Sequence, residues 1–197
     1  MKTIKSILLA VVITLALQAN AQKRYSLTKS TFEVAGTSNI HDWVMRSSDG
    51  TGSAIFTITD SKLVDIKNLT ITLPAESIKS SKTSMDDVAY ECLDTKTHKN
   101  IKYTLKSAEK VNETTWIFTG TYTIAGVNKD FKTQVRATTN DNDTFVLQGT
   151  NKMTFTDFEM TPPSAALGVV RAGKEITVLF NITLTDFARN ENVLVIK

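Results

Sequence analysis

Few side chains in this sequence are suited to catalysis or metal binding, and two of them are adjacent. The chain has two histidines, His41 and His98, and one cysteine, Cys92. His41 and Asp42 occupy neighbouring positions in a segment that alternates like a β-strand, so their side chains are expected on opposite faces and cannot form a direct dyad. The sequence contains no nucleophile elbow, phosphate loop or His-x-x-x-His spacing. An enzyme is therefore the weakest of the functional hypotheses.

The other chemical candidates have ordinary structural explanations. His98 lies in a polar connection, where a solvated histidine is expected. Asp86 and Asp87 fall in the first turn of a predicted helix, where carboxylates favour the positive end of the helix dipole. Cys92, on an apolar face of that helix, is expected to be a small buried residue. Cys92, His98 and His41 do not have a recognised zinc-ligand spacing, so we predict neither a metal nor a cofactor.

The N-terminus has the pattern of a secretory signal peptide. Lys2 and Lys5 precede an apolar run over residues 7–17 that is short for a membrane span, and Ala19-Asn20-Ala21 is a small-x-small cleavage site. We expect residues 1–21 to be removed and residues 22–197 to form a single exported domain, periplasmic or extracellular, with no permanent membrane anchor. An uncleaved anchor is the alternative.

Composition argues against nucleic acid as a partner. The full chain has a formal net charge of +3, and cleavage would remove two lysines and no acidic residue, which leaves +1. Basic residues are scattered and form no stripe, so no surface is suited to a phosphate backbone. Because the chain has one cysteine, an internal disulfide is excluded and the domain must be stabilised by packing.

Most of the remaining sequence alternates with the period of two that is typical of β-strands. Short apolar-polar segments are separated by turns rich in Gly, Asn, Asp and Ser, without the spacing of βαβ units. Eight or nine such strands predict an antiparallel sandwich or a closed barrel around one apolar interior. The inward-facing residues that we expect to line this interior, and to contact any ligand there, are Phe32, Val34, His41, Trp43, Met45, Phe56, Leu69, Ile71, Trp116, Phe118, Tyr122, Phe145, Leu147, Val178 and Phe180.

One helix is expected, from Ser84 as its N-cap to about Leu93. Four small or apolar side chains recur on one of its faces at helical spacing: Met85, Val88, Ala89 and Cys92. That face is expected to pack on a sheet or to cover an opening.

A second apolar segment, residues 162–170, falls between two predicted strands, where connections are normally polar. It is either a flap at the barrel mouth that meets ligand or membrane, or a loop packed on the barrel end.

Several short motifs, taken together and in order, resemble a YceI-like domain over residues 25–185. They are Gly36-Thr37-Ser38 with His41-Asp42-Trp43, Ser84-Met85-Asp86, the run from Gly120 to Gly126, and Phe155-Thr156-Asp157-Phe158 with Pro162-Pro163, Gly168 and Gly173. The resemblance implies an all-β fold: an extended, eight-stranded, lipocalin-like antiparallel barrel with one short helix near its mouth. It also implies an apolar interior that holds a polyisoprenoid-type chain, such as an isoprenoid quinone.

Two functional hypotheses are open for such a barrel. In the first, the protein binds a long apolar molecule for storage or transport in the cell envelope, since one isoprene unit would contribute roughly 3 kcal/mol at about 0.8 kcal/mol per buried CH₂. In the second, the barrel is filled and serves a structural or stress-response role. His41 is either the polar end of the ligand site or a packed residue, whereas Trp43 is expected mainly to pack. The oligomeric state is left open, with a dimer as one option.

Overall fold

The computed structural model describes residues 21–59, 62–140 and 144–188, so the predicted signal peptide, apart from Ala21, lies outside the described residues. The described chain is mostly β-strand. In order, its elements are β1 (Ala21–Ser38), β2 (Trp43–Ser47), β3 (Thr51–Thr59), β4 (Lys62–Pro74), the 3-10 turn η1 (Ala75–Ser77), α2 (Thr83–Cys92), β5 (Asn100–Lys110), β6 (Thr115–Ile124), β7 (Val127–Asn140), β8 (Thr144–Thr154), the 3-10 turn η2 (Phe155–Phe158), β9 (Ser164–Ala165) and β10 (Val170–Asp186).

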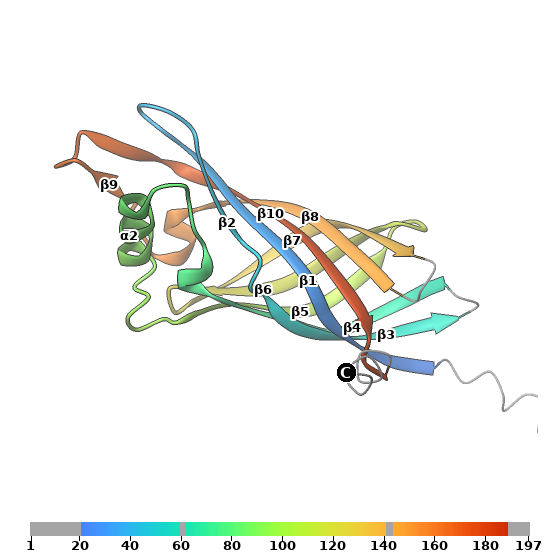
Figure 1. Ribbon diagram of the computed structural model, residues 1–197. Helices are drawn as coiled ribbons and strands as arrows, with labels where there is room; N and C mark the ends of the chain where they lie inside the picture. Colours follow the sequence, from blue (N-terminus) through green and yellow to red (C-terminus); the bar gives the residue numbers. More distant parts are fainter. Residues whose placement is uncertain (1–20, 60–61, 141–143, 189–197) are drawn as a thin grey trace, which may run out of the picture.

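Eight of these strands close into an antiparallel barrel. Neighbours pair in the order β1-β3-β4-β5-β6-β7-β8-β10, and β10 pairs back onto β1 from Tyr25↔Asp186 to Ser38↔Ala172. Closure joins the first and last strands, so the wall has no free edge between them. The predicted eight-stranded antiparallel barrel is therefore confirmed. Figure 1 shows that the barrel is drawn out along its axis, with α2 and β9 at one end, which we call the open end.

The short strand β2 extends the line of β3 and does not enlarge the barrel. β3 pairs with residues 21–26 of β1, and β2 pairs with residues 32–36 of the same strand. The expectation that His41 and Asp42 lie within an alternating strand is therefore wrong. Gly36 belongs to β1, Trp43 opens β2, and His41 and Asp42 lie in the connection between the two strands. The argument that strand geometry separates these two side chains does not apply.

The end of the barrel away from α2 is filled by buried aromatic and aliphatic side chains. Tyr25 stacks on Phe56 with ring centroids 4.7 Å apart, and Phe145 meets both rings edge-on, at 5.2 and 5.1 Å. We call this end the closed end, and its cluster includes Tyr25, Phe56, Leu105, Trp116, Val135, Phe145, Leu147, Ile182 and Leu184. Because this packed half stabilises the barrel, the fold does not need side chains to fill the other half.

Helix α2 lies across the open end (Figure 1). It begins at Thr83, and its N-cap, Lys82, makes no side-chain capping hydrogen bond. Ser84 as N-cap was therefore wrong. The nearby carboxylate of Asp86 is buried and accepts hydrogen bonds from the N–H and the hydroxyl of Ser80, both at 2.7 Å. Asp86 thus ties the first turn of the helix to the segment before it.

A second set of contacts joins α2 and the residues after it to η1 and the residue that follows η1. The Tyr90 hydroxyl lies 2.8 Å from the carbonyl oxygen of Glu76 and 3.2 Å from that of Ile78. Just beyond the helix, the Thr95 hydroxyl donates to the Glu76 carboxylate at 2.8 Å. These bonds hold the apolar face of the helix toward the barrel interior.

The end of β8 is shaped by a capping box. The Thr154 hydroxyl accepts the N–H of Asp157 at 3.2 Å, and the Asp157 carboxylate accepts the N–H of Thr154 at 2.8 Å. This reciprocal pair begins η2 and ends the strand. β8 therefore ends at Thr154, and Phe155 belongs to η2. Phe155 and Phe158 are both buried.

Candidate ligand-binding cavity

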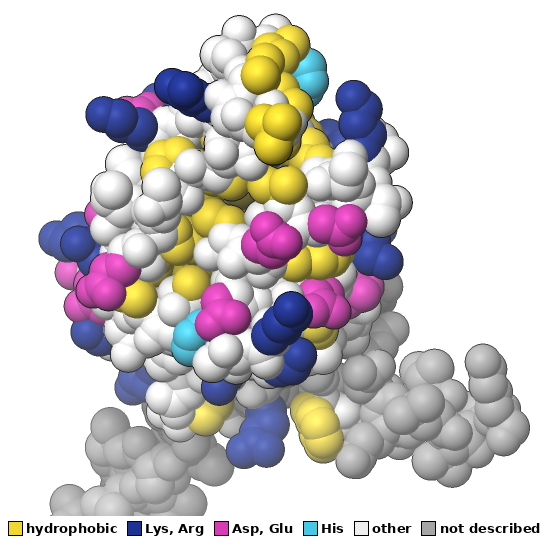
Figure 2. Space-filling model, turned by 90° about the vertical axis from the view of Figure 1, so that its left-hand side faces the viewer, with side chains coloured by type: hydrophobic (Ala, Val, Ile, Leu, Met, Phe, Trp, Pro, Cys, Tyr) yellow, Lys and Arg dark blue, Asp and Glu magenta, His cyan; other side chains and the backbone are white. Residues whose placement is uncertain are grey.

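The barrel is hollow at its open end. The cavity has a volume of about 530 Å³, within the range of about 300–1,000 Å³ that is usual for small-molecule sites. Figure 2 looks onto this end and shows a hollow surrounded by apolar side chains. At this end the barrel is therefore not filled by its own side chains.

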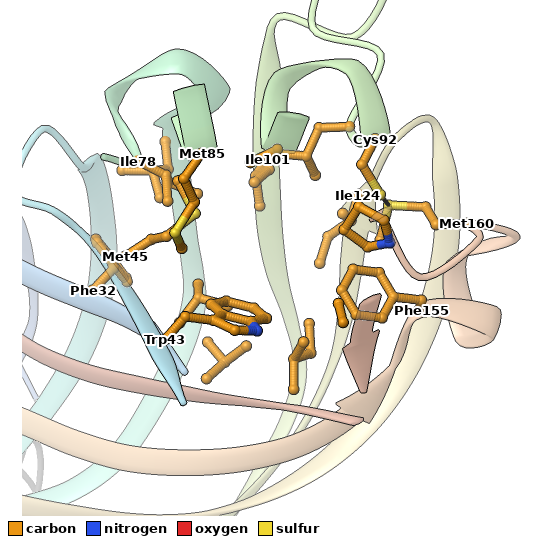
Figure 3. A pocket seen from close by; sticks show the side chains of 18 of the residues that line it. Phe32, Trp43, Met45, Ile78, Met85, Cys92, Ile101, Ile124, Phe155 and Met160 are labelled. Atoms are coloured by element: carbon orange, nitrogen blue, oxygen red, sulfur yellow. Dashed lines mark hydrogen bonds between the residues drawn. The ribbon is translucent and has the colours of Figure 1, made fainter. Parts of the chain in front are cut away.

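Two apolar walls face each other across the cavity (Figure 3). One is built from β1, β2, the segment after η1, and the start of α2; the other from the end of α2, β6, η2 and the residues that follow it. The labelled members of the first wall are Phe32, Trp43, Met45, Ile78 and Met85, and those facing them include Cys92, Ile124, Phe155 and Met160. Because three of these side chains are methionines, which are unbranched and flexible, the walls can adapt to the shape of an apolar guest.

The position of Trp43 is set by β1. Its indole N–H donates to the carbonyl oxygen of Thr37 at 2.9 Å, and its ring lies over Gly36, where any Cβ would clash with it. Glycine is therefore required here for the close approach of the ring. With its one polar group already bonded to the backbone, Trp43 offers an apolar surface to the cavity.

A group of polar side chains lies among these apolar walls, deeper than the rim. The Asn151 amide donates to the Tyr122 hydroxyl at 3.0 Å and to the Thr133 hydroxyl at 2.6 Å. The neighbouring Tyr103 hydroxyl is buried and has no hydrogen-bond partner within the described part of the chain. Burial is the main cause that raises the pKa of both phenols, so both stay neutral at physiological pH.

Eleven of the fifteen predicted lining residues lie on the cavity wall. They come from β1, β2, β4, β6, β10 and the β1–β2 connection: Phe32, Val34, His41, Trp43, Met45, Leu69, Ile71, Phe118, Tyr122, Val178 and Phe180. Their part in ligand binding stays a prediction.

His41 differs from the other ten because it is exposed at the rim. Its Nδ1 lies 2.8 Å from the carbonyl oxygen of Asp42, in the connection between β1 and β2. The expectation of an inward-facing strand residue was wrong. Tyr103, Tyr122 and Thr133 are instead polar residues that lie among the apolar walls.

The remaining four predicted residues do not reach the cavity. Phe56, Trp116, Phe145 and Leu147 belong to the closed-end cluster and are between 0% and 1% exposed. Placing them on the ligand wall was wrong because alternation separates the inward face of a strand from its outward face but does not give depth along the barrel axis.

Other cavity residues were missing from the predicted set. The α2 face lines the cavity through Met85, Val88, Ala89 and Cys92, which confirms that this face covers an opening. Further lining residues are Ile78, Ile101, Phe155, Met160 and Ile176. For Ile176 the alternation was informative, since it shares a face of β10 with the predicted residues Val178 and Phe180. Ile101 lies on β5, a strand from which no lining residue was predicted. Three further lining residues lie outside the strands, where alternation does not indicate which way a side chain faces: Ile78, Phe155 and Met160.

The apolar segment over residues 162–170 forms part of the rim. β9 pairs with the start of β10 through Ala165↔Val170 and Ser164↔Arg171. Pro163, Ala165, Ala166 and Val170 line the cavity, whereas Leu167 and Val169 are exposed. One part of the segment therefore lines the cavity, and the turn formed by the other part projects into solvent.

The described residues contain no cluster of three or more His, Cys, Asp or Glu side chains arranged to hold a metal ion. No described helix is long and apolar enough to cross a membrane.

A family model for the YceI-like domain matches residues 25–184. The chain belongs to the YceI-like family. The resemblance that the sequence motifs indicated is thereby confirmed. No curated protein matches the sequence at a significant level.

Solved structures share the fold of this YceI-like protein at low sequence identity. BcnA of Burkholderia cenocepacia is 15% identical with a TM-score of 0.62, over 78% of this chain and 95% of that one. A polyisoprenoid binding domain from Saccharophagus degradans, implicated in plant cell wall breakdown, is 12% identical with a TM-score of 0.62, over 82% of this chain and 98% of that one. The YceI protein of Campylobacter jejuni is 19% identical with a TM-score of 0.54, over 67% and 79%.

Proposed function

We propose that this YceI-like protein binds one long, slender, apolar molecule in the open half of its barrel and carries it in the cell envelope. An isoprenoid-type chain is the class of ligand that fits best. The observation that carries the proposal is the apolar cavity of about 530 Å³ beneath α2.

The shape of the cavity favours a chain over a compact molecule. On β10, lining residues run from Val170 to Ile182, a strand length of about 40 Å at about 3.3 Å per residue. The closed-end cluster then stops the cavity. A narrow, extended guest could follow this run of residues, and each of its buried CH₂ groups would contribute about 0.8 kcal/mol.

The polar groups of the cavity support binding over catalysis. The Cys92 thiol lines the wall, but burial raises its pKa, which disfavours the thiolate that a nucleophile requires. Tyr103 and Tyr122 are held neutral in the same way. Such groups can orient a ligand oxygen by hydrogen bonding, which is the usual part of a few polar groups in an apolar site.

Family and sequence add two independent supports. A solved relative with the same fold is described as a polyisoprenoid binding domain, and we extend that ligand class to this chain. The signal-peptide pattern of residues 1–21 supports a carrier that acts outside the cytoplasm, where lipids that leave one membrane must be shielded from water.

Mass spectrometry of an organic extract tests the proposal. The chain is purified without detergent and extracted with chloroform and methanol, with an unrelated exported protein from the same cells as control. We expect a long-chain apolar compound in near-equimolar amount with the protein and absent from the control. An extract without such a compound, together with no uptake of added farnesol by the purified protein, would contradict the proposal and favour a structural role.

A further inference from the structure

The rim of the cavity carries a small apolar tip made of two chain segments. Ile40, in the β1–β2 connection, is 60% exposed; Leu167, in the β9–β10 turn, is fully exposed; and Val169 beside it is 66% exposed. We call these three side chains the apolar tip, and Figure 2 shows apolar side chains projecting above the hollow. The other large apolar side chains that are exposed among the described residues, Val64, Val111 and Phe187, lie toward the closed end.

Asn39 joins the two segments of the tip into one unit. Its side-chain amide donates to the carbonyl oxygen of Val169 at 2.9 Å, and its side-chain oxygen accepts the N–H of Arg171 at 2.8 Å. Its own N–H donates to the carbonyl oxygen of Arg171 at 3.1 Å. Hydrogen bonds therefore hold the two turns of the tip together as one projecting unit.

The β9–β10 turn holds its apolar side chains outward at a conformational cost. Ala166, Leu167 and Gly168 follow one another with φ of 51°, 54° and 85°, a left-handed conformation that disfavours a side chain as large as leucine. The Arg171 Nε–H donates to the carbonyl oxygen of Gly168 at 2.9 Å and stabilises this turn. The turn closes the β9–β10 pairing, and it places leucine, in place of a small or polar residue, in contact with water, which makes this side chain a candidate contact for a binding partner.

We propose that the apolar tip inserts into the interface of a lipid bilayer and docks the mouth of the barrel on the membrane that supplies or receives its ligand. This inference rests on the proposed function, because docking on a membrane is useful only to a protein that exchanges an apolar ligand with that membrane. Ala165, Ala166 and Val170 of the same turn line the cavity. Insertion of the tip would therefore bring the cavity opening to the membrane surface, and an apolar chain could enter without crossing water.

Charges around the mouth favour one orientation on an anionic surface. Arg171 is exposed at the base of the tip, and Figure 2 shows Lys and Arg side chains on both sides of the tip. The lip formed by α2 and the residue after its C-cap carries exposed carboxylates at Asp87, Glu91 and Asp94, and acidic side chains gather below the hollow in the same view. Anionic headgroups would attract the tip and repel the helix lip.

The size of the tip favours a bilayer over a second copy of the chain. A stable protein interface uses about 20–30 residues on each side, whereas the apolar tip has three side chains. Shallow insertion of a few aliphatic side chains, assisted by basic residues, is sufficient for reversible binding to a membrane surface.

Vesicle co-sedimentation tests the docking. The chain beginning at Gln22 is mixed with vesicles of equal parts phosphatidylethanolamine and phosphatidylglycerol. The tip variant combines Ile40→Ser, Leu167→Asn and Val169→Ser, with asparagine at 167 because it tolerates the left-handed conformation. The control variant removes three exposed apolar side chains at the other end through Val64→Ser, Val111→Ser and Phe187→Ser. We expect the tip variant to lose at least about tenfold in partitioning, since a buried aliphatic side chain contributes about that factor or more, and the control variant to bind like the natural sequence.

Two results would overturn the docking. One is equal partitioning of the tip variant and the control variant. The other is a change in the sedimentation coefficient of the tip variant without lipid, which would assign the tip to a contact between copies. The lipid extract of the tip variant is measured in parallel. Retained cargo with unchanged partitioning would reject the docking and leave the proposed function standing. Absent cargo in the natural sequence, together with no uptake of added farnesol, would reject the proposed function itself.

Discussion

Tyr103 and Tyr122 are direct partners in the β5–β6 register, with ring centroids 4.8 Å apart, but only the Tyr122 hydroxyl has a hydrogen-bond partner. The two neighbouring phenols therefore differ in hydrogen bonding. We expect Tyr122→Phe to lower the free energy of unfolding by about 1 kcal/mol, because the Asn151 amide loses a partner, and Tyr103→Phe to leave it unchanged or higher. Urea denaturation of both variants measures the difference. Equal losses would show that the Tyr103 hydroxyl is also bonded.

The two tryptophans provide an optical test of where a ligand lies. Trp43 lines the cavity, whereas Trp116 is 1% exposed in the closed-end cluster. Addition of farnesol is expected to change the intrinsic fluorescence of the natural sequence and of Trp116→Phe, but not of Trp43→Phe. A response that is lost in Trp116→Phe and kept in Trp43→Phe would place the ligand at the closed end and contradict the proposal.

Cys92 is the sole cysteine of the chain and can report on occupancy through its reactivity. Burial raises the pKa of its thiol. Since the thiolate is the reactive form, alkylation by iodoacetamide should begin at a higher pH than for an exposed cysteine. Because the thiol lines the cavity, farnesol should slow the reaction further at every pH. The urea-unfolded chain serves as the control for complete labelling, and a labelling rate that is the same with and without farnesol would contradict a guest near α2.

The closed-end cluster is expected to affect stability and not binding. Phe145 is 1% exposed and meets Tyr25 and Phe56 edge-on, so Phe145→Ala should cost about 3–5 kcal/mol of unfolding free energy. Among molecules that remain folded, the amount of extracted lipid per protein should be unchanged. Loss of lipid from a folded Phe145→Ala variant would extend the ligand site into the closed end.

This division of the barrel also shows what the sequence could predict. Alternation placed Phe32, Trp43 and Phe145 correctly on inward faces, because the side-chain period of a strand is fixed by backbone geometry. It could not separate Trp43 on the cavity from Phe145 in the packed core, since depth depends on which strands pair and at what register. The helix face of α2 was found because helical spacing is equally local.

His41 illustrates the other limit. Its neighbours alternate, but the chain leaves β1 at Ser38 and enters β2 at Trp43, so the histidine falls in the connection. The Ser38 N–H and hydroxyl both bond to the carbonyl oxygen of His41, at 3.0 and 2.7 Å. Such a local side-chain bond competes with strand continuation, and residue alternation alone does not reveal it.

The central claim, that the open half of the barrel holds a ligand, is tested most directly by blocking the cavity. Val178 lines it, whereas its neighbour Thr177 on β10 does not, since successive strand residues face opposite sides. Native mass spectrometry would compare bound lipid in the natural sequence, in Val178→Trp and in Thr177→Trp. The account predicts a lipid-bound species in the natural sequence and in Thr177→Trp, and its loss in a folded Val178→Trp variant. The same bound fraction in Val178→Trp as in Thr177→Trp would contradict it.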